Sequence, residues 1–345
     1  EDKLERHVDG EINWGKFLGG IVLVGRPNEI LYHGAFGERD VGKQMYKDTV
    51  IDLASLTKPT TVGTCLAKLV TDGDINLNEK INTYLSELGG NWSDVMTVLH
   101  AATHSSGTNN PPLYKDYTGE ELVDQILTAD AVWEPGTEDY YCNVGTIRLS
   151  EMIANVTNTE YETYFDNNIL SVLQTQDTLF GPITDESLKE RCALFRNDGD
   201  LGRIADQFAR RIGRPVGNAG LFSTALEVSK FAELWLQEGT YNGSQIFSQS
   251  VTDTFTSSQS PVAGVDNRGI MWKLDFSLGS DYTDRISDDT YYHTGYNGHH
   301  LVIDPVNNYY MVVLTVWNHH AIDASYSEAV VSRERIMRNI LDTLF

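Results

Sequence analysis

The chain has 345 residues, 41% of them hydrophobic and 22% charged, a composition typical of a globular protein with a large core. With 26 basic and 49 acidic residues, the formal net charge is −23. This balance argues against nucleic acid or an anionic membrane as a partner, because both require a basic surface. No apolar run reaches the roughly 18 residues of a membrane span, so we expect no transmembrane segment.

The three cysteines, Cys65, Cys142 and Cys192, show no metal-type spacing, and their odd number argues against a disulfide framework. We therefore expect them to be small buried residues. The chain begins with Glu1 rather than Met, which is compatible with removal of an upstream signal or anchor, so the lack of a leader does not imply a cytoplasmic protein.

Two apolar runs near the N-terminus predict a β-hairpin. Residues 20–24 have the pattern of a buried strand, residues 26–29 form the turn and residues 30–37 return as the second strand. An apolar helix is then predicted from Ser55 to Val70, because Asp72-Gly73-Asp74 provides a stop signal.

The middle of the chain, from about residue 76 to residue 184, is predicted to be mainly helical. Apolar residues three and four apart indicate helices at 122–127, 147–156 and 161–173, with loops at 105–117 and 133–136. Residues 186–220 have many charges and few clear elements, and they predict a long excursion of the chain.

Strand signals return in the last third, after an amphipathic helix at 225–239. The predicted strands are 271–276, 291–295, 300–303 and 309–317, with a turn at 304–308 and a final helix at 325–344.

Strands at both chain ends with helices between them predict an α/β (α+β) fold. Its antiparallel sheet is built from both termini and flanked by helices. No repeat or linker is visible, so we expect one domain over residues 1–345. Its sheet lobe would comprise about 1–64 and 220–345, and its inserted, mainly helical lobe about 65–219.

The first candidate motif is Ser55-Leu56-Thr57-Lys58, at the head of the predicted helix. Residues three apart share a helix face, so the Lys58 ammonium can reach the Ser55 hydroxyl. A serine becomes a good nucleophile when a neighbouring base removes its proton. Pro59 suits a helix start. Alone, the pattern is a weak signal, because a helix cap beside a solvated lysine is its more frequent meaning.

The second candidate motif is Tyr141-Cys142-Asn143, on a predicted loop before a helix. A phenol beside an ammonium loses its proton more readily and can relay protons. The amide of Asn143 can hold a substrate carbonyl. The alternative is a buried tyrosine followed by a helix-capping asparagine.

The third candidate motif is His293-Thr294-Gly295-Tyr296, on a late strand. Gly295 would let substrate backbone lie against the strand edge. The backbone N–H of Tyr296 can pair with that of Ser55 as an oxyanion hole. His293 can act as a cationic or hydrogen-bonding wall for a carboxylate, although a polar patch at a strand end is the simpler alternative.

The three motifs in this order resemble the serine β-lactamase and penicillin-binding protein superfamily, in its branch related to class C β-lactamases and DD-carboxypeptidases. The resemblance covers nearly the whole chain, since residues 99–107, 217–225 and 299–305 are similar to further family segments. It implies that Ser55 is acylated and that Lys58 and Tyr141 share proton transfer. It further implies a substrate-orienting role for Asn143 and an acyl-donor site along 293–295.

One departure from that pattern concerns the third motif. His293 stands where most β-lactamases have lysine, and His-Thr-Gly is typical of some DD-carboxypeptidases, D-aminopeptidases and esterases of this branch. The first hypothesis is therefore a D-alanyl-amide peptidase of the DD-carboxypeptidase type. An esterase for D-alanyl or short-chain esters comes next, then a β-lactamase, and then a non-catalytic relative that binds cell-wall material.

These hypotheses share a substrate that is small or derived from peptidoglycan, and the resemblance implies an extracytoplasmic enzyme without a cofactor. The loops around 109–117 and 196–215 are expected to distinguish the substrates. His100 and His104, with the pairs 299–300 and 319–320, suggest a metal site, but the glutamate of the zinc-protease motif is missing. An α/β-hydrolase is disfavoured because no Gly-x-Ser-x-Gly is present.

Overall fold

The computed structural model describes residues 2–14, 17–195, 200–317 and 326–345. Within them lies a fully antiparallel six-stranded sheet of order β3-β2-β1-β11-β10-β9. Its strands are β1 (Phe17–Arg26), β2 (Glu29–Asp40), β3 (Lys43–Gln44), β9 (Tyr291–Thr294), β10 (His300–Asp304) and β11 (Tyr309–Trp317). The pairing of β1 with β11 joins the two ends of the chain, as the sequence predicted.

The central strands are apolar on both faces because both faces of the sheet are covered. In β1, Ile21 and Leu23 face one core while Val22 and Val24 face another. This division follows the two-residue alternation of a strand. A continuous apolar run in β1 is therefore what a sheet with two buried faces requires.

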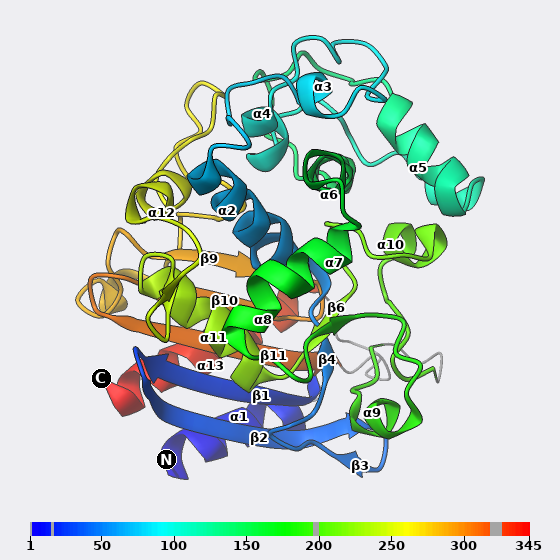
Figure 1. Cartoon of the computed structure of the whole chain (residues 1–345). Coiled ribbons are helices and arrows are strands. Elements are labelled where there is room, and N and C mark those ends of the chain that lie inside the picture. The colour runs from blue at the N-terminus through cyan, green and yellow to red at the C-terminus, as the bar shows by residue number, and fades with distance from the viewer. Residues whose placement is uncertain (1, 15–16, 196–199, 318–325) are drawn as a thin grey trace.

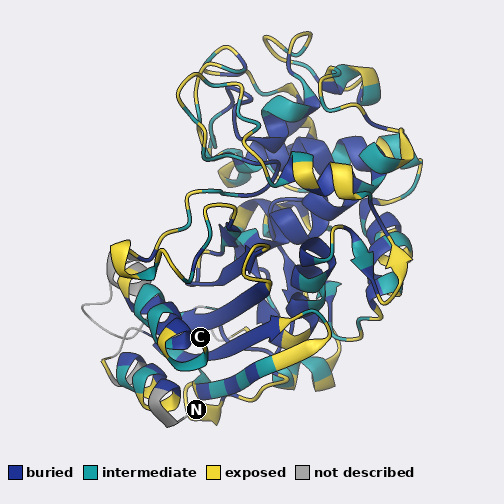
Figure 2. Ribbon diagram, turned by 90° about the vertical axis from the view of Figure 1, so that its left-hand side faces the viewer, coloured by how far each residue is buried: buried dark blue, intermediate teal, exposed yellow. Residues whose placement is uncertain are grey.

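Helices cover the two faces of this sheet (Figures 1 and 2). On one face α1 (Asp2–Asn13) packs beside α13 (Tyr326–Leu344), and on the other α11 (Ala225–Leu236) lies against β1, β10 and β11. Figure 2 shows α1 and α13 with their exposed sides turned away from the buried strands. The final helix was predicted correctly, although its predicted first residue, Ser325, lies outside the described residues, and α1 was missed.

The remaining helices form the upper part of the molecule and its flanks (Figure 1). They are α2 (Thr64–Asp72), α3 (Ile81–Tyr84), α4 (Val98–Ala102), α5 (Gly119–Thr128), α6 (Asn143–Thr157), α7 (Tyr161–Phe165), α8 (Ser171–Leu173), α9 (Glu186–Arg191), α10 (Gln207–Ile212) and α12 (Gln249–Phe255). Short strands add two small sheets: β4 (Ile51–Asp52), β6 (Leu221–Ser223) and β5 (Leu179–Phe180) in one, β7 (Thr240–Tyr241) and β8 (Ser244–Gln245) in the other. The sequence patterns did not predict these short strands.

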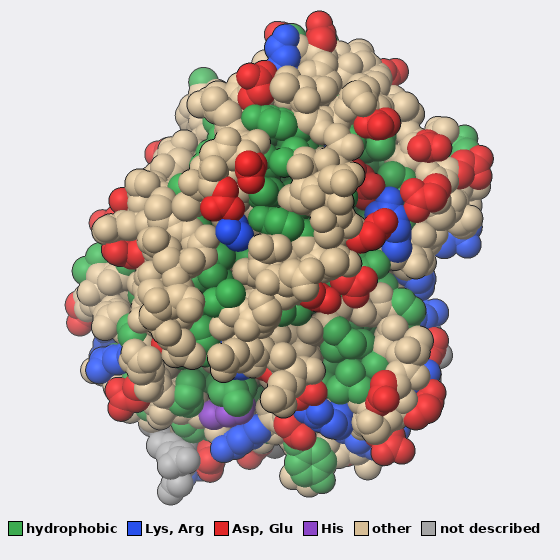
Figure 3. Space-filling view, viewed as in Figure 1, with side chains coloured by type: hydrophobic (Ala, Val, Ile, Leu, Met, Phe, Trp, Pro, Cys, Tyr) green, Lys and Arg blue, Asp and Glu red, His purple; other side chains and the backbone are tan. Residues whose placement is uncertain are grey.

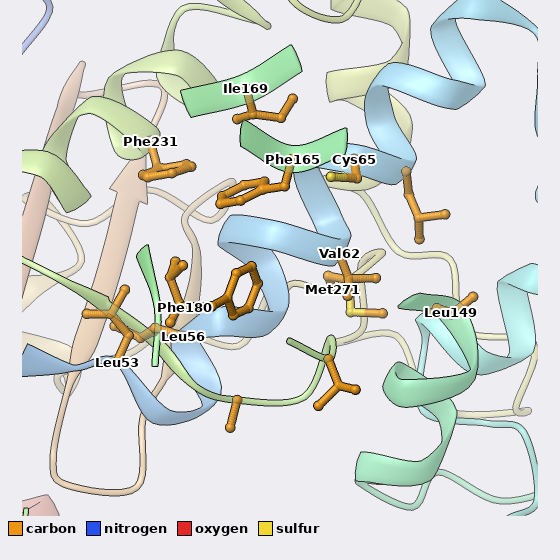
Figure 4. Packing of buried hydrophobic residues seen from close by; sticks show 14 of the residues in the cluster. Leu53, Leu56, Val62, Cys65, Leu149, Phe165, Ile169, Phe180, Phe231 and Met271 are labelled. Atoms are coloured by element: carbon orange, nitrogen blue, oxygen red, sulfur yellow. The ribbon is translucent and has the colours of Figure 1, made fainter. Parts of the chain in front are cut away.

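A continuous apolar core connects the sheet to the helical part. Figure 4 shows Leu53, just before the first motif, and Leu56, within it, in the same cluster as Phe165 and Phe180. Cys65, Cys142 and Cys192 are all free and buried, as predicted. The turn that holds Ser55 is therefore anchored from below by apolar packing.

The predicted strand at 271–276 is wrong. Met271 has φ of 62°, and its N–H donates to Ala102 in the helical part, so the chain turns there instead of extending. Only Lys273 pairs with Tyr292 of β9, as an isolated bridge. The apolar signal came from Met271 and Trp272, which are buried in the core and not in a ladder.

Candidate active site

The first motif brings its two functional side chains into contact. Lys58 Nζ donates to Ser55 Oγ at 3.2 Å and to the backbone carbonyl of Asn218 at 2.9 Å. Lys58 is fully buried while Ser55 is half-buried, so the lysine lies behind the hydroxyl. The sequence predicted this contact but not the role of Asn218, which orients the ammonium.

The backbone around Ser55 departs from the simple helix that the sequence predicted. A 3₁₀ turn (Ala54–Leu56) is followed by a π-helical segment (Lys58–Gly63) before α2 begins. Ala54 has φ of 49°, a left-handed conformation that costs an alanine free energy and is typical of functional turns. The 3₁₀ and π geometry, rather than a straight helix, is what presents Ser55 to the cavity described below.

Asp52 supports this turn from beneath. Its Oδ1 accepts the N–H of Ala54 and its Oδ2 accepts the N–H of Ala205, both at 2.9 Å. His299 Nδ1 accepts the N–H of Thr315, so Nε2 carries the proton and donates to the Asp52 carbonyl at 3.0 Å. Burial raises the pKa of the Asp52 carboxyl to about 6.

This pKa predicts a pH-dependent contribution to stability. An unfolded Asp has a pKa of 3.8, so between about pH 4 and pH 6 the folded chain binds a proton that the unfolded chain has lost. The Asp52 contribution therefore falls as pH rises through this window, by about 3 kcal/mol. Urea unfolding of wild type and Asp52→Asn from pH 4 to pH 7 gives the free energy of unfolding at each pH. The difference between the two pH slopes is the contribution of Asp52. Parallel pH profiles of the two proteins would contradict the assignment.

Tyr141 and Asn143 face the same cavity, held by a residue that the sequence did not single out. Asn110 Nδ2 donates to the Tyr141 carbonyl at 3.0 Å, and Asn110 Oδ1 accepts the Asn143 N–H at 2.6 Å. Lys58 Nζ lies 4.8 Å from the centre of the Tyr141 ring. Asn143 is the first residue of α6, so the loop predicted here is already the helix start.

Asn110→Ala is expected to lower kcat about 10- to 100-fold, because small displacements of catalytic groups have effects of this size. Asn91 provides a matched control. Its amide likewise donates to one backbone carbonyl and accepts one backbone N–H, both of Ala131, and it does not line the cavity. Steady-state kinetics and thermal unfolding of both variants separate positioning from stability. Equal losses of activity in the two variants would contradict the positioning role.

His293 is buried and neutral, which corrects the prediction that it can be cationic. Burial, with the charges of Lys58 and Lys273, holds the pKa of His293 well below its ordinary range. Its Nδ1 lies 2.9 Å from the Thr294 carbonyl, which can only accept, so Nδ1 carries the proton. The motif therefore supplies a neutral imidazole with positive charge nearby.

Gly295 is required by packing within the protein, and the access of substrate backbone to this strand edge stays a prediction. A Cβ at this position would lie 2.7 Å from His299 Cδ2 and 2.8 Å from the Leu53 carbonyl oxygen. Because the backbone before the nucleophile turn approaches so closely, only glycine fits. The third motif is in this way packed directly against the first.

Gly295→Ala is expected to destabilise the protein by about 1–3 kcal/mol and to lower activity, because the added methyl displaces the nucleophile turn. Gly10→Ala in α1 is the control, since a Cβ there meets nothing within 4 Å. A helical Gly-to-Ala change at an open position stabilises by up to about 1 kcal/mol. Thermal unfolding and kcat measure both changes, and full activity in Gly295→Ala would show that the turn tolerates displacement.

A cavity of about 350 Å³ opens beside Ser55. Its lining residues come from all three motifs and from the two loops expected to distinguish substrates, of which 196–199 lie outside the described residues. They include Ser55, Asn110, Tyr114, Tyr141, Asn143, Phe195, Asp206, Phe208 and Tyr296. Tyr296 follows the end of β9 and stacks on Phe195 with ring centres 6.1 Å apart. The oxyanion role of its N–H stays a prediction.

Among the described residues, no group of three or more His, Cys, Asp or Glu side chains is placed to bind a metal ion. The pair 319–320 lies outside them. His100 caps α4 through Thr97, and His104 Nδ1 accepts the Cys142 N–H at 3.2 Å, so both have structural roles. None of the helices in the described ranges combines the length and apolarity required for a membrane span.

Comparisons with known proteins show the family to which the chain belongs. The beta-lactamase family profile matches residues 4–331, so the chain belongs to this family. A candidate D-alanyl-D-alanine carboxypeptidase of Escherichia coli O157:H7 is 25% identical, with 91% of this chain and 81% of that protein covered. The chain is a serine hydrolase by this membership.

Solved structures share the fold at low sequence identity. EstCE1, a hydrolase with promiscuous acyltransferase activity, is similar with a TM-score of 0.75 and 19% identity, covering 97% of this chain and 98% of its own. A class C beta-lactamase from Rhodobacter sphaeroides has a TM-score of 0.74 at 18% identity, with 99% and 100% covered. These similarities confirm the predicted fold class.

Proposed function

We propose that this serine hydrolase is a DD-carboxypeptidase-like enzyme that cleaves D-alanyl amides derived from peptidoglycan and acts outside the cytoplasm. The observation that carries the proposal is the positive charge around the third motif. Lys58 and Lys273 both lower the pKa of His293, so their fields reach the strand that would border the leaving group. A leaving group that ends in a carboxylate, such as D-alanine, is complementary to that field.

The proposed reaction proceeds through an acyl-enzyme. Ser55 Oγ attacks the scissile carbonyl while either Lys58 in its neutral amine form or Tyr141 as a phenolate takes its proton, and the proton then passes to the leaving amine. The backbone N–H groups of Ser55 and Tyr296 would hold the oxyanion, with Asn143 orienting the acyl amide. Water then cleaves the ester. The 3.2 Å contact between Lys58 and Ser55 supports the first step.

A pair of peptides with the same acyl part tests the leaving group. One ends in D-Ala-D-Ala with a free carboxylate, the other in the corresponding C-terminal amide. We expect kcat/KM to be about 10- to 100-fold higher for the carboxylate, by analogy with other charge-assisted contacts. Lys273→Met should reduce this ratio, while Lys230→Met, on α11 outside the cavity, should preserve it. A ratio of one in the wild type would refute the carboxypeptidase assignment.

An esterase is the second candidate, favoured by the aromatic walls of the cavity. Tyr114 packs edge-on against Phe208 with ring centres 4.9 Å apart, and Phe195 stacks on Tyr296. Such walls suit an uncharged acyl or alkoxy group. Turnover of short-chain esters with no turnover of either peptide would favour this candidate. Clean binding of both substrate classes without turnover would instead favour a non-catalytic relative.

A further inference from the structure

The described lining of the cavity beside Ser55 carries one fixed charge. Among the described residues that line it, only Asp206 is formally charged, while the rest are aromatic, amide, hydroxyl or small apolar side chains. Lys58 is close but lies buried behind Ser55 and is not part of the lining. The described lining of the cavity is therefore negative, in contrast to the positive surroundings of His293, which the proposed function assigns to the leaving group.

The local contacts of Asp206 leave one of its oxygens available. Oδ1 accepts the N–H of Ala209 at 3.0 Å and Nδ2 of Asn218 at 2.9 Å, which occupies its lone pairs. Within the described part of the chain, Oδ2 accepts no hydrogen bond and the carboxylate forms no ion pair. The nearby Arg210 guanidinium donates to the carbonyls of Ile204 and Ala205 instead.

The same contacts connect Asp206 to the reaction centre. The amide of Asn218 donates to Asp206, and its backbone carbonyl accepts from Lys58, which in turn donates to Ser55. Asn218 is fully buried, so water does not compete with these contacts. Asp206 is thereby held at a defined position relative to the nucleophile.

The aromatic rings of the cavity complement a positive charge. Phe195 and Tyr296 stack at one part of the lining, and Tyr114 and Phe208 meet at another. Aromatic faces attract ammonium groups and bury alkyl stems. The surface as a whole adds a negative field, of the same sign as the charge of Asp206, since the net charge is −23 and acidic side chains are spread over the face shown in Figure 3.

We propose that Asp206 is a specificity-determining residue that selects acyl donors bearing an aliphatic ammonium group. The ammonium donates to Asp206 Oδ2 and its alkyl stem lies against the aromatic rings. This inference rests on the proposed function, because it names the acyl half of the substrate whose leaving group was assigned above. Together the two halves define a substrate that is positive on the acyl side and negative on the leaving side.

Two boronic acids test this inference independently of any turnover. Both have the form acyl-NH-CH₂-B(OH)₂, with an acyl chain that ends in an ammonium in one and in a hydroxyl in the other. Ser55 Oγ forms a bond to boron as it releases its proton, giving a tetrahedral adduct that imitates the acylation transition state. Because binding requires only the nucleophile, failure of the peptide assay would leave this test intact.

The expected result is that wild type binds the ammonium boronate about 10- to 100-fold more tightly than the hydroxyl boronate. Asp206→Asn should abolish this preference while the affinity for the hydroxyl compound is retained, because asparagine can still cap α10. Asp185→Asn is the matched control, since Asp185 caps α9 in the same manner and does not line the cavity. It should keep the preference.

Added salt provides a second readout, since only a charge-based preference weakens with ionic strength. We expect the ratio of the two dissociation constants, measured by direct binding to wild type, to fall as salt rises and to stay flat in Asp206→Asn. Equal dissociation constants in wild type, or an unchanged preference in Asp206→Asn, would overturn the inference.

Discussion

Ser55→Ala is expected to abolish turnover of every substrate, with a loss of about 10⁶-fold in kcat. Losses of this size follow when the nucleophile of an acyl-enzyme mechanism is removed. The half-buried hydroxyl has Lys58 as its hydrogen-bond partner, so the alanine protein should fold normally. Intact-protein mass after incubation with a penicillin measures the same step directly. Only the wild type should gain the mass of the acyl group.

The penicillin experiment also separates the alternative substrates. A long-lived adduct favours a penicillin-binding peptidase, and drug hydrolysis without a lasting adduct favours a β-lactamase. If the protein forms no adduct and does not hydrolyse the drug, the esterase becomes the favoured candidate. Undiminished turnover by Ser55→Ala would refute the mechanism itself.

Lys58→Met is expected to lower kcat by about 10³- to 10⁴-fold, at the upper end of what general acid–base groups contribute. Methionine has a similar length and keeps the buried volume but cannot donate to Ser55 or accept its proton. The carbonyl of Asn218 loses a partner, which costs about 1–3 kcal/mol. Removal of a buried charge offsets part of that cost.

Tyr141→Phe distinguishes the two proton-transfer groups. If Lys58 is the base, the phenylalanine protein should retain much more activity than Lys58→Met. If Tyr141 is the base, the two losses should be similar. Thermal unfolding of both proteins controls for damage to the fold, and activity within 10-fold of wild type in Lys58→Met would contradict a catalytic role for the lysine.

Local patterns were sufficient for the central elements. The hairpin around residues 26–29 and the strand pair at 300–317 were predicted because apolar runs and turn residues specify them within a few positions. Errors arose where an apolar signal served the core instead of a ladder, as at Met271 and Trp272. The short strand β6 was missed because its partners, β4 and β5, lie far away in the sequence.

The sequence by itself determined the motif residues, since the spacing of Ser55 and Lys58 brings their side chains together on one stretch of helical backbone. Tertiary structure alone decided the protonation of His293, because its pKa is controlled by burial and by lysines that are remote in the sequence but near in space. It also decided the roles of Asn110, Asn218 and Asp206. Each acts through hydrogen bonds to residues remote in the chain, and no local pattern encodes which backbone group will lie opposite an amide or a carboxylate.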